Sequence, residues 1–218
     1  MPNITLLYYT ANKIPEKFAK NIREHLLWSS KGKPIISISQ QPMDFGKENI
    51  HAIGLVPNMY NIYIQIVMGA EKAKTKYVAC CEDDVLYCQE HFDFEPTERA
   101  FYYNNSVRHL RPKGYYCNEN ILMSQCIVER DYLLETFALR FKKFTTPESI
   151  VGSFGEPGRE EHLIGLPKVE GRFFQTEIYP IIFHHRYGIS GVRVVDTEIV
   201  QELPHWGKAN ELWEKYYN

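Results

Sequence analysis

The chain has 218 residues, of which 44% are hydrophobic and 24% are charged, and these values are ordinary for a globular protein with a sizeable core. Its formal net charge of −2 excludes a global electrostatic field that would draw it to nucleic acid or to an anionic membrane. The five cysteines form no C-x-x-C pair, which argues against a disulfide framework or a zinc ribbon and predicts a reducing compartment.

Neither the start of the chain nor its apolar runs predict a membrane segment. The first residues, MPNITLLYYT, lack the basic region and the long apolar stretch that are typical of a signal peptide. No apolar run approaches the ~20 residues needed to span a bilayer. We therefore expect a cytoplasmic protein without a membrane span.

The first half of the sequence alternates strand and helix patterns. Five segments show them, in the order strand, helix, strand, helix, strand: residues 4–9, 15–27, 34–39, 58–73 and 76–81. In the first helix Phe18, Ile22 and Leu26 lie on one face. Residues 40–50 are rich in turn formers and predict a loop. This order predicts an α/β domain with a largely parallel sheet.

The second half is less regular. Residues 120–128 predict a strand and residues 130–144 a helix. Residues 145–165 form a Gly- and Pro-rich loop that is long enough to be a functional loop or a lid. An apolar run with two histidines follows at residues 179–191, and residues 207–218 predict a short closing helix.

Three acids, Glu82, Asp83 and Asp84, directly follow the third predicted strand. In parallel sheets ligands bind beyond the carboxyl ends of the strands. Adjacent carboxylates repel one another unless a cation, N–H donors or water relieves them. Glu82 and Asp84 project to the same side of an extended segment, and their oxygens suit Mg²⁺ or Mn²⁺. The alternative is an acidic turn in which one Asp caps a helix and the others face water.

With this acidic motif the chain resembles a known family. A β-α-β-α-β start followed by a D-x-D-type motif is similar to the GT-A fold of nucleotide-sugar glycosyltransferases, particularly the family-2-like ones. The stretches SISQQPMDFGKENI, EDDVLYCQEHFDFEP, FYYN, SQ at 124–125 and HHRYGISG resemble a small group of bacterial and phage proteins of that type. The acidic motif of that group reads E-x-D-x-L-Y, matched by Glu82, Asp84, Leu86 and Tyr87. The resemblance extends from about residue 4 to about residue 207.

The resemblance implies the fold and the division of the chain. We expect a single GT-A (Rossmann-like) α/β domain over residues 1–218, with a mixed, mostly parallel central sheet flanked by helices. Residues 1–87 would form the nucleotide-binding half, and residues 88–218 the acceptor and catalytic half.

The resemblance also implies which polar side chains hold the nucleotide sugar. They share positions at or near strand ends: Tyr9, Thr10, Asn12, Ser39, Gln40, Gln41, Glu82, Asp83 and Gln125. The Asp that often follows the second strand in the family is absent here. Asp83 has the alternative of facing water or capping the backbone.

The expected metal is Mn²⁺ or Mg²⁺. The resemblance makes Asp84 the principal ligand, with Glu82 binding through water or holding the ribose. A late histidine often completes the metal shell in this family, which implies His184 or His185. The alternative is a packed or hydrogen-bonded histidine pair at a strand end.

The family uses a carboxylate to take the proton of the acceptor hydroxyl, and such a base lies at the start of a helix beyond the metal site. The nearest match is GREEHLIG at 158–165, which implies Glu160 or Glu161. The alternative is a solvated helix start, where Glu is favoured by the helix dipole.

The sequence therefore predicts a metal-dependent, inverting glycosyltransferase. It would move a sugar from a nucleotide-diphosphate sugar, such as a UDP-sugar, to a hydroxyl acceptor that is a saccharide or a hydroxymethylated DNA base. One alternative is a nucleotidyltransferase on a related sheet, although TANKIPEK lacks the expected glycine-rich phosphate loop. Others are a non-catalytic nucleotide-sugar-binding domain and a zinc-binding regulator. The regulator would use Cys80, Cys81, Cys88 and the histidines as ligands, whose spacing fits no common zinc site.

Overall fold

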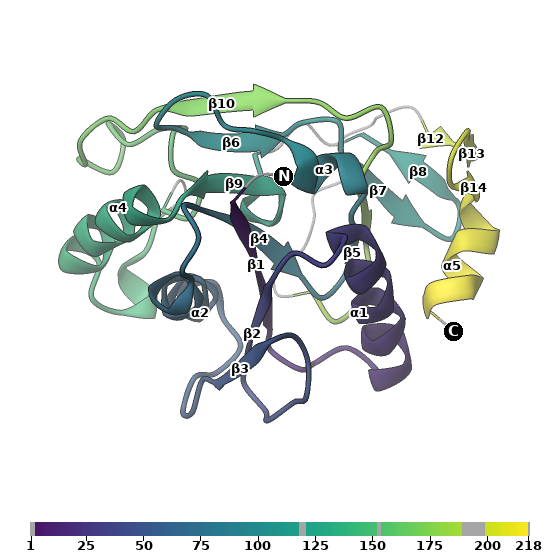
Figure 1. Cartoon of the computed structure of the whole chain (residues 1–218), viewed down its shortest axis with the longest axis horizontal. Coiled ribbons are helices and arrows are strands. Elements are labelled where there is room, and N and C mark those ends of the chain that lie inside the picture. The colour runs from purple at the N-terminus through teal and green to yellow at the C-terminus, as the bar shows by residue number, and fades with distance from the viewer. Residues whose placement is uncertain (1–2, 118–120, 152–153, 189–198, 218) are drawn as a thin grey trace.

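The computed structural model describes residues 3–117, 121–151, 154–188 and 199–217, and within them it shows a mixed central sheet flanked by helices (Figure 1). The seven strands of this sheet follow the order β10-β6-β9-β4-β1-β2-β3. Their bounds are β1 Ile4–Thr10, β2 Ile35–Ser39, β3 Glu48–His51, β4 Tyr77–Glu82, β6 Phe101–Asn104, β9 Cys126–Glu129 and β10 Gly171–Phe174. Only β9 runs antiparallel to its neighbours, so the sheet is mostly parallel, as predicted.

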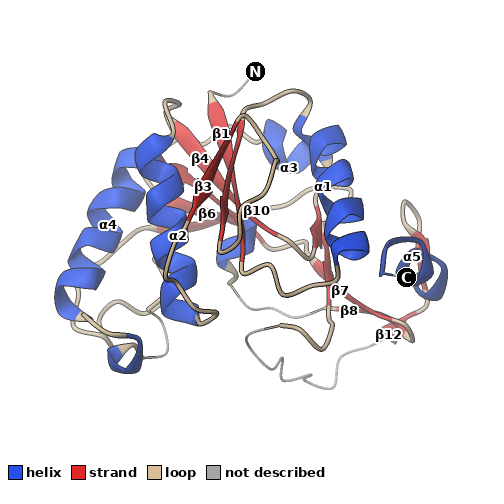
Figure 2. Ribbon diagram, turned by 90° about the horizontal axis from the view of Figure 1, so that it is seen from below, coloured by secondary structure: helices blue, strands red, loops and turns tan. Residues whose placement is uncertain are grey.

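Helices cover both faces of the central sheet (Figure 2). The helices of the described residues are α1 Glu16–Ser30, α2 Met59–Lys72, α3 Gln89–Asp93, α4 Arg130–Lys143 and α5 Ala209–Tyr217. Successive side chains of β1 point to opposite faces: Leu7 joins the core under α2 and α4, whereas Leu6 joins the core under α1 and α3. All of β1 is buried because both faces are covered.

A second, smaller sheet lies beside the carboxyl end of the central one. Its order is β12-β8-β7-β11-β5, formed by β5 Val85–Leu86, β7 Arg108–Arg111, β8 Gly114–Tyr116, β11 Ile181–Phe183 and β12 Ile199–Val200. Strand β11 pairs antiparallel with β5 and parallel with β7. Helix α5 packs on this sheet and on α1, and a short hairpin of β13 Glu202–Leu203 and β14 Gly207–Lys208 precedes it.

The structure corrects two expectations and defines the strand content of two further segments. Residues 40–50, predicted as a loop, contain the start of edge strand β3. The strand predicted at 120–128 is instead a 3-10 turn, η1 Met123–Gln125, followed by β9, and residue 120 lies outside the described residues. In the run 179–191 only Ile181–Phe183 is a strand, and residues 189–191 lie outside the described residues. A second 3-10 turn, η2 Pro147–Ser149, occupies part of the long loop.

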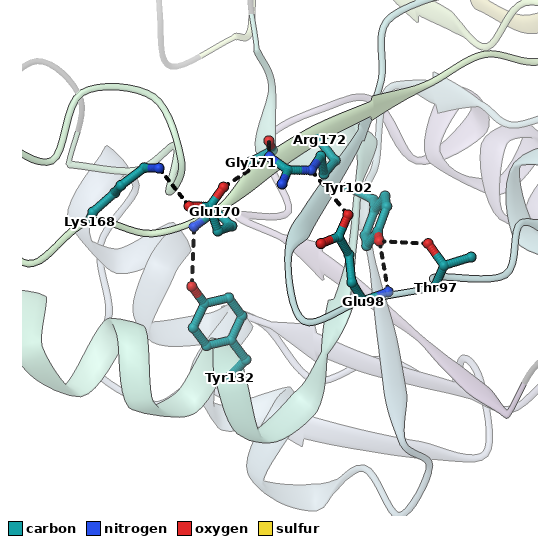
Figure 3. A network of polar contacts seen from close by, with 8 residues as sticks. All are labelled: Thr97, Glu98, Tyr102, Tyr132, Lys168, Glu170, Gly171 and Arg172. Atoms are coloured by element: carbon teal, nitrogen blue, oxygen red, sulfur yellow. Dashed lines mark hydrogen bonds and ion pairs between the residues drawn. The ribbon is translucent and has the colours of Figure 1, made fainter.

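The outer strand β10 is bordered by charged side chains (Figure 3). The Arg172 guanidinium lies 3.2 Å from a carboxylate oxygen of Glu98 and 2.9 Å from one of Glu170, and Lys168 lies 2.7 Å from Glu170. The backbone N–H of Glu170 donates to the Tyr132 hydroxyl on α4. Exposed pairs contribute only ~0–1 kcal/mol each. Charge along an edge strand also disfavours pairing with another chain.

The chain order of the central sheet reverses between β1 and β4, because β2 and β3 lie on one side of β1 and β4 lies on the other. Such a switch point leaves an open crevice at the carboxyl ends of the two strands, where ligands bind in α/β sheets. Among the described residues, no helix combines the length and the apolarity needed to cross a membrane.

Candidate functional site

A cavity of about 310 Å³ opens at this switch point, and both halves of the chain line it. The first half contributes the ends of β1 and β4 with part of α2. The second contributes His109, η1, Glu156 and the segment after β11. A volume of this size is in the range of small-molecule binding sites.

The first two acids of the triplet are held by the end of β1. Tyr9 and Glu82 are register partners in the parallel ladder, and the Tyr9 hydroxyl donates to a Glu82 carboxylate oxygen at 3.2 Å. The Thr10 hydroxyl donates to Asp83 and accepts from the backbone N–H of Asn12 at 2.8 Å. Burial raises the pKa of both carboxyls, and the charge of the neighbouring acids raises them further. The pocket therefore disfavours its own negative charge when no cation is present.

Asp84 is the acid of the triplet that has a carboxylate oxygen without a hydrogen bond. Its Oδ1 is buried and has no hydrogen-bond partner among the residues that the structure describes, and its Oδ2 lies 3.3 Å from Nε2 of His185. Its carbonyl accepts from the backbone N–H of Phe183 at 2.9 Å, which continues the pairing of β11 with β5. That pairing brings the two histidines of the second half to the acids of the first.

His185 meets Asp84 through a defined ring nitrogen. Its Nδ1 accepts from the backbone N–H of Tyr187 at 3.1 Å, so the proton of the neutral ring sits on Nε2, facing Asp84. Burial lowers the pKa of His185, but the adjacent Asp84 carboxylate outweighs burial and raises it overall. Within the described residues Nε2 of His185 makes no well-formed hydrogen bond, so its contact with Asp84 is a close approach of the two side chains, and the metal role of His185 stays a prediction.

His184 also lines the cavity but is engaged elsewhere. The Arg111 Nε–H donates to its Nδ1 at 2.8 Å, and the Tyr116 hydroxyl lies 2.5 Å from the same nitrogen. Burial lowers the pKa of His184, and the Arg111 cation lowers it further. The predicted metal role of His184 therefore competes with an existing contact to Arg111.

His109 and Glu156 are among the cavity residues that were not predicted. His109 on β7 is 3% exposed, and neither of its ring nitrogens has a hydrogen-bond partner in the described part of the chain. Burial lowers its pKa to about 4, so the ring is neutral near pH 7. Glu156 lines the cavity from the long loop, and burial raises its pKa. A lone histidine in RHLR carries no sequence signal, whereas the loop with Glu156 was already singled out by its length.

Glu156 reaches the cavity because the preceding residue is glycine. A Cβ at Gly155 would lie 1.5 Å from the hydroxyl oxygen of Tyr63 and 1.9 Å from its Cζ. The loop can therefore pack on Tyr63 of α2 only where no side chain intervenes.

Several predicted site residues do not line the cavity: Asn12, Gln40, Gln41, Gln125, Glu160 and Glu161. The side chain of Asn12 accepts from the backbone N–H of Gln41 at 2.9 Å, which joins the loops after β1 and β2. Gln40 is buried, and its Nε2 donates to Oε1 of Gln65 at 3.4 Å. Gln65 itself lines the cavity. Gln125 is 1% exposed, and its side-chain amide atoms meet no hydrogen-bond partner among the residues that the structure describes.

Glu161 forms a buried ion pair. Its Oε1 accepts from Arg140 at 2.8 Å and from the backbone N–H of Gly158 at 2.5 Å, and the two side chains are 5% and 1% exposed. Arg140 also donates to the Phe154 carbonyl at 2.8 Å. These contacts tie α4 to the long loop. Glu160 is partly exposed, 3.9 Å from Arg159. The geometry thus gives Glu161 a structural partner in place of a substrate.

The acids fit a divalent cation that needs few protein ligands. No group of three or more His, Cys, Asp or Glu side chains within the described residues is arranged to hold a metal. The unpartnered, buried Oδ1 of Asp84 nevertheless lies beside two further carboxylates. Mg²⁺ and similar hard ions are commonly held by one or two carboxylates, with waters and substrate phosphates completing the shell.

Comparisons with known proteins identify no family: no family model matches the chain, and no curated protein sequence matches it. Among solved structures, a glycosyltransferase involved in glycosylation of the major capsid of PBCV-1 is 14% identical, over 80% of this chain and 82% of that one, with a TM-score of 0.49. A Drosophila β-1,4-galactosyltransferase 7 mutant in complex with manganese, UDP-Gal and xylobiose is 15% identical, over 79% and 65%, with a TM-score of 0.42. Bifunctional IspDF from Campylobacter jejuni is 11% identical, over 80% and 50%, with a TM-score of 0.44. At these identities and TM-scores none of them assigns an activity to this chain.

Proposed function

We propose that the chain is a metal-assisted glycosyltransferase that moves a sugar from a nucleotide-diphosphate sugar to a hydroxyl group. The observation that carries this proposal is the buried, unpartnered Asp84 oxygen in a cavity at the switch point of the sheet. A carboxylate oxygen left without a donor costs free energy unless a ligand satisfies it.

The negative charge of the three acids determines which ligands the cavity can bind. A diphosphate would meet Glu82, Asp83 and Asp84 as like charges, so its binding would require a cation that relieves this repulsion. Asp84 and Glu82 would hold Mg²⁺ or Mn²⁺, which would neutralise the charge of the departing diphosphate. Tyr9 orients Glu82 and Thr10 orients Asp83 through hydrogen bonds, and Lys13 on the cavity wall adds a positive charge.

We assign the proton-accepting role to Glu156. Glu160 and Glu161 remain the residues expected from sequence, but Glu156 is the carboxylate of that loop that lines the cavity. Its raised pKa makes it a stronger base than an exposed Glu. The acceptor oxygen would form a bond to the anomeric carbon while its proton passes to Glu156. The bond from that carbon to the diphosphate breaks, which releases a nucleoside diphosphate with inversion.

The test is a screen of nucleotide sugars with Mn²⁺ or Mg²⁺ that measures release of the nucleoside diphosphate. We expect Asp84→Asn to lower turnover by about 100-fold or more, because a charged contact to the cation is lost. Asp44→Asn, at an exposed position outside the cavity, is the matched control and should leave turnover unchanged. Glu156→Gln should lower turnover more than Glu160→Gln.

Direct binding provides a second readout. Nucleoside diphosphate should bind in calorimetry only when the divalent ion is present, and Asp84→Asn should abolish that dependence. Normal turnover by Asp84→Asn would overturn the proposal. Release of pyrophosphate instead of nucleoside diphosphate would identify a nucleotidyltransferase. Metal-dependent binding with no turnover of any donor would identify a binding domain.

A further inference from the structure

A second, open hollow of about 750 Å³ adjoins the cavity and shares His184, His185 and Tyr187 with it. We call it the basic groove, and it is lined by Pro15, Lys17, Arg111, Pro112, His184, His185, Arg186, Tyr187, Trp213 and Tyr217. The shared residues form the boundary between groove and cavity, and His185 at this boundary lies 3.3 Å from Asp84. A molecule seated in the groove can therefore present one group to the acids.

The charged residues that line the basic groove are all cationic within the described part of the chain. They are Lys17, Arg111 and Arg186, and no described Asp or Glu lines the groove. Among the residues that the structure describes, neither arginine forms an ion pair with a carboxylate. Arg111 donates to His184, and Arg186 donates to the Tyr187 hydroxyl at 2.7 Å. On a chain of net charge −2, this is a local positive site next to a negative one.

Aromatic side chains form part of the groove. The rings of Trp213 and Tyr217 lie 4.4 Å apart, and Tyr217 also stacks on His185 at 6.3 Å. Tyr187 lies beneath the Arg186 guanidinium, 4.9 Å from the ring centroid. Flat apolar faces beside polar tips suit a ring-shaped molecule that carries hydroxyl groups.

We propose that the basic groove binds the acceptor, and that the acceptor is an anionic saccharide bearing a carboxylate or a phosphate. This inference rests on the function proposed above, because the groove is continuous with the cavity assigned to the donor. Guanidinium groups pair with the planar oxygens of carboxylate and phosphate in two-point contacts, which a neutral sugar cannot offer. The same anion would be repelled by the acids, so its charged end stays in the groove and a hydroxyl enters the cavity.

The number of cations favours a saccharide over nucleic acid. A protein that binds nucleic acid can contact on the order of 6–10 phosphates, whereas the described residues that line this groove include three cationic side chains. A short acidic glycan needs only one or two such contacts.

Direct binding tests the groove without requiring turnover. Calorimetry would compare a neutral disaccharide, a uronate-containing disaccharide, a sugar phosphate and a single-stranded DNA oligonucleotide, each with the wild-type protein. We expect at least one anionic sugar to bind about tenfold or more tightly than the neutral disaccharide, with an affinity that falls as salt rises. The uronate and phosphate arms distinguish the two sources of negative charge.

The variant is Arg186→Gln, since Arg186 is exposed and lies outside the donor cavity. It should weaken binding of the anionic sugar about tenfold. Lys142→Gln, an exposed lysine on α4, should leave this binding unchanged. Equal affinity for neutral and anionic sugars, or no effect of Arg186→Gln, would overturn the inference, as would tighter binding of DNA than of either anionic sugar. If anionic sugars bind as expected and no nucleotide sugar is bound or turned over, the proposed transferase fails while the groove stands.

Discussion

Glu82, Asp83 and Asp84 are adjacent in the sequence, yet each meets a different partner in the cavity. Tyr9 donates to Glu82, Thr10 donates to Asp83, and His185 approaches Asp84, whose other oxygen is unpartnered. Hydroxyl donors stabilise the ionised form of two acids and leave the third available. The protein's hydroxyl donors thus relieve part of the repulsion among the three carboxylates. The repulsion that is left favours binding of a cation.

Tyr87 holds the backbone of the acidic strand end in place through hydrogen bonds. Its hydroxyl accepts from the backbone N–H of Glu82 at 3.1 Å and donates to the Ser124 carbonyl at 2.8 Å. The ring is fully buried. The last residue of the E-x-D-x-L-Y motif therefore links the acidic strand end to the 3-10 turn that forms another wall of the cavity.

Glu161→Gln tests whether that carboxylate is structural. Arg140 would keep its charge in a buried position with a neutral partner, and removing one member of a buried pair costs ~3–5 kcal/mol. We expect the free energy of unfolding, measured with urea, to fall by about that amount. Glu160→Gln, on a partly exposed neighbour, should change it little. A Glu161→Gln protein as stable as wild type but inactive would return Glu161 to the role of catalytic base.

The regular elements of the first half could be predicted because their patterns are local. Residues 4–9, 34–39 and 76–81 are short apolar runs that correspond to β1, β2 and β4, and the acids were correctly placed at a strand end. The second sheet could not be predicted, because β5, β7, β8, β11 and β12 have between two and four residues each. A strand of that length shows no periodicity, and its partner is distant along the chain.

The same limit applies to the site. Tyr9, Thr10 and the acids follow predicted strands, whereas His185 reaches Asp84 only through the pairing of β11 with β5. His109 depends on the same sheet through β7. Local patterns gave no reason to prefer Glu156 over Glu160 and Glu161. That choice follows from the packing of the loop on α2 and α4.

Gly155→Ala tests the contact between the long loop and α2. The added methyl group would overlap the Tyr63 ring, which is 3% exposed and stacked on Phe137, so the loop must move. Overpacking of this kind costs ~1–3 kcal/mol. We expect a loss of stability of that size in urea unfolding, together with lower turnover because Glu156 is displaced.

A second variant separates this clash from other effects of the substitution. In a Tyr63→Leu background the obstacle is smaller, so Gly155→Ala should cost less there than in wild type, which a double-mutant cycle measures. Equal costs in both backgrounds would show that the close approach does not set the loop position.

The two halves of the chain are joined through buried contacts. Unfolding of the core would therefore also disrupt the cavity. The three apolar clusters combine strands of both sheets with all five helices. A buried histidine lies among them. His91 on α3 is 0% exposed and packs against Tyr87, Phe92 and Phe174, and its Nε2 has no hydrogen-bond partner among the described residues. Its Nδ1 lies 3.3 Å from the side-chain nitrogen of Asn104.

His91 should make the fold sensitive to acid. Burial lowers its pKa to about 3, from an unfolded value of ~6.5, so the unfolded chain takes up a proton that the folded protein rejects. The contribution of neutral His91 is complete above pH ~6.5 and is lost as pH falls from there toward 3. Between pH 7.5 and pH 5 wild type should lose ~2 kcal/mol more than His91→Gln, measured by urea unfolding at each pH. The exposed His51→Gln control should lose as much as wild type. If His91→Gln also loses as much as wild type, His91 does not titrate on unfolding, and another group must account for the acid sensitivity.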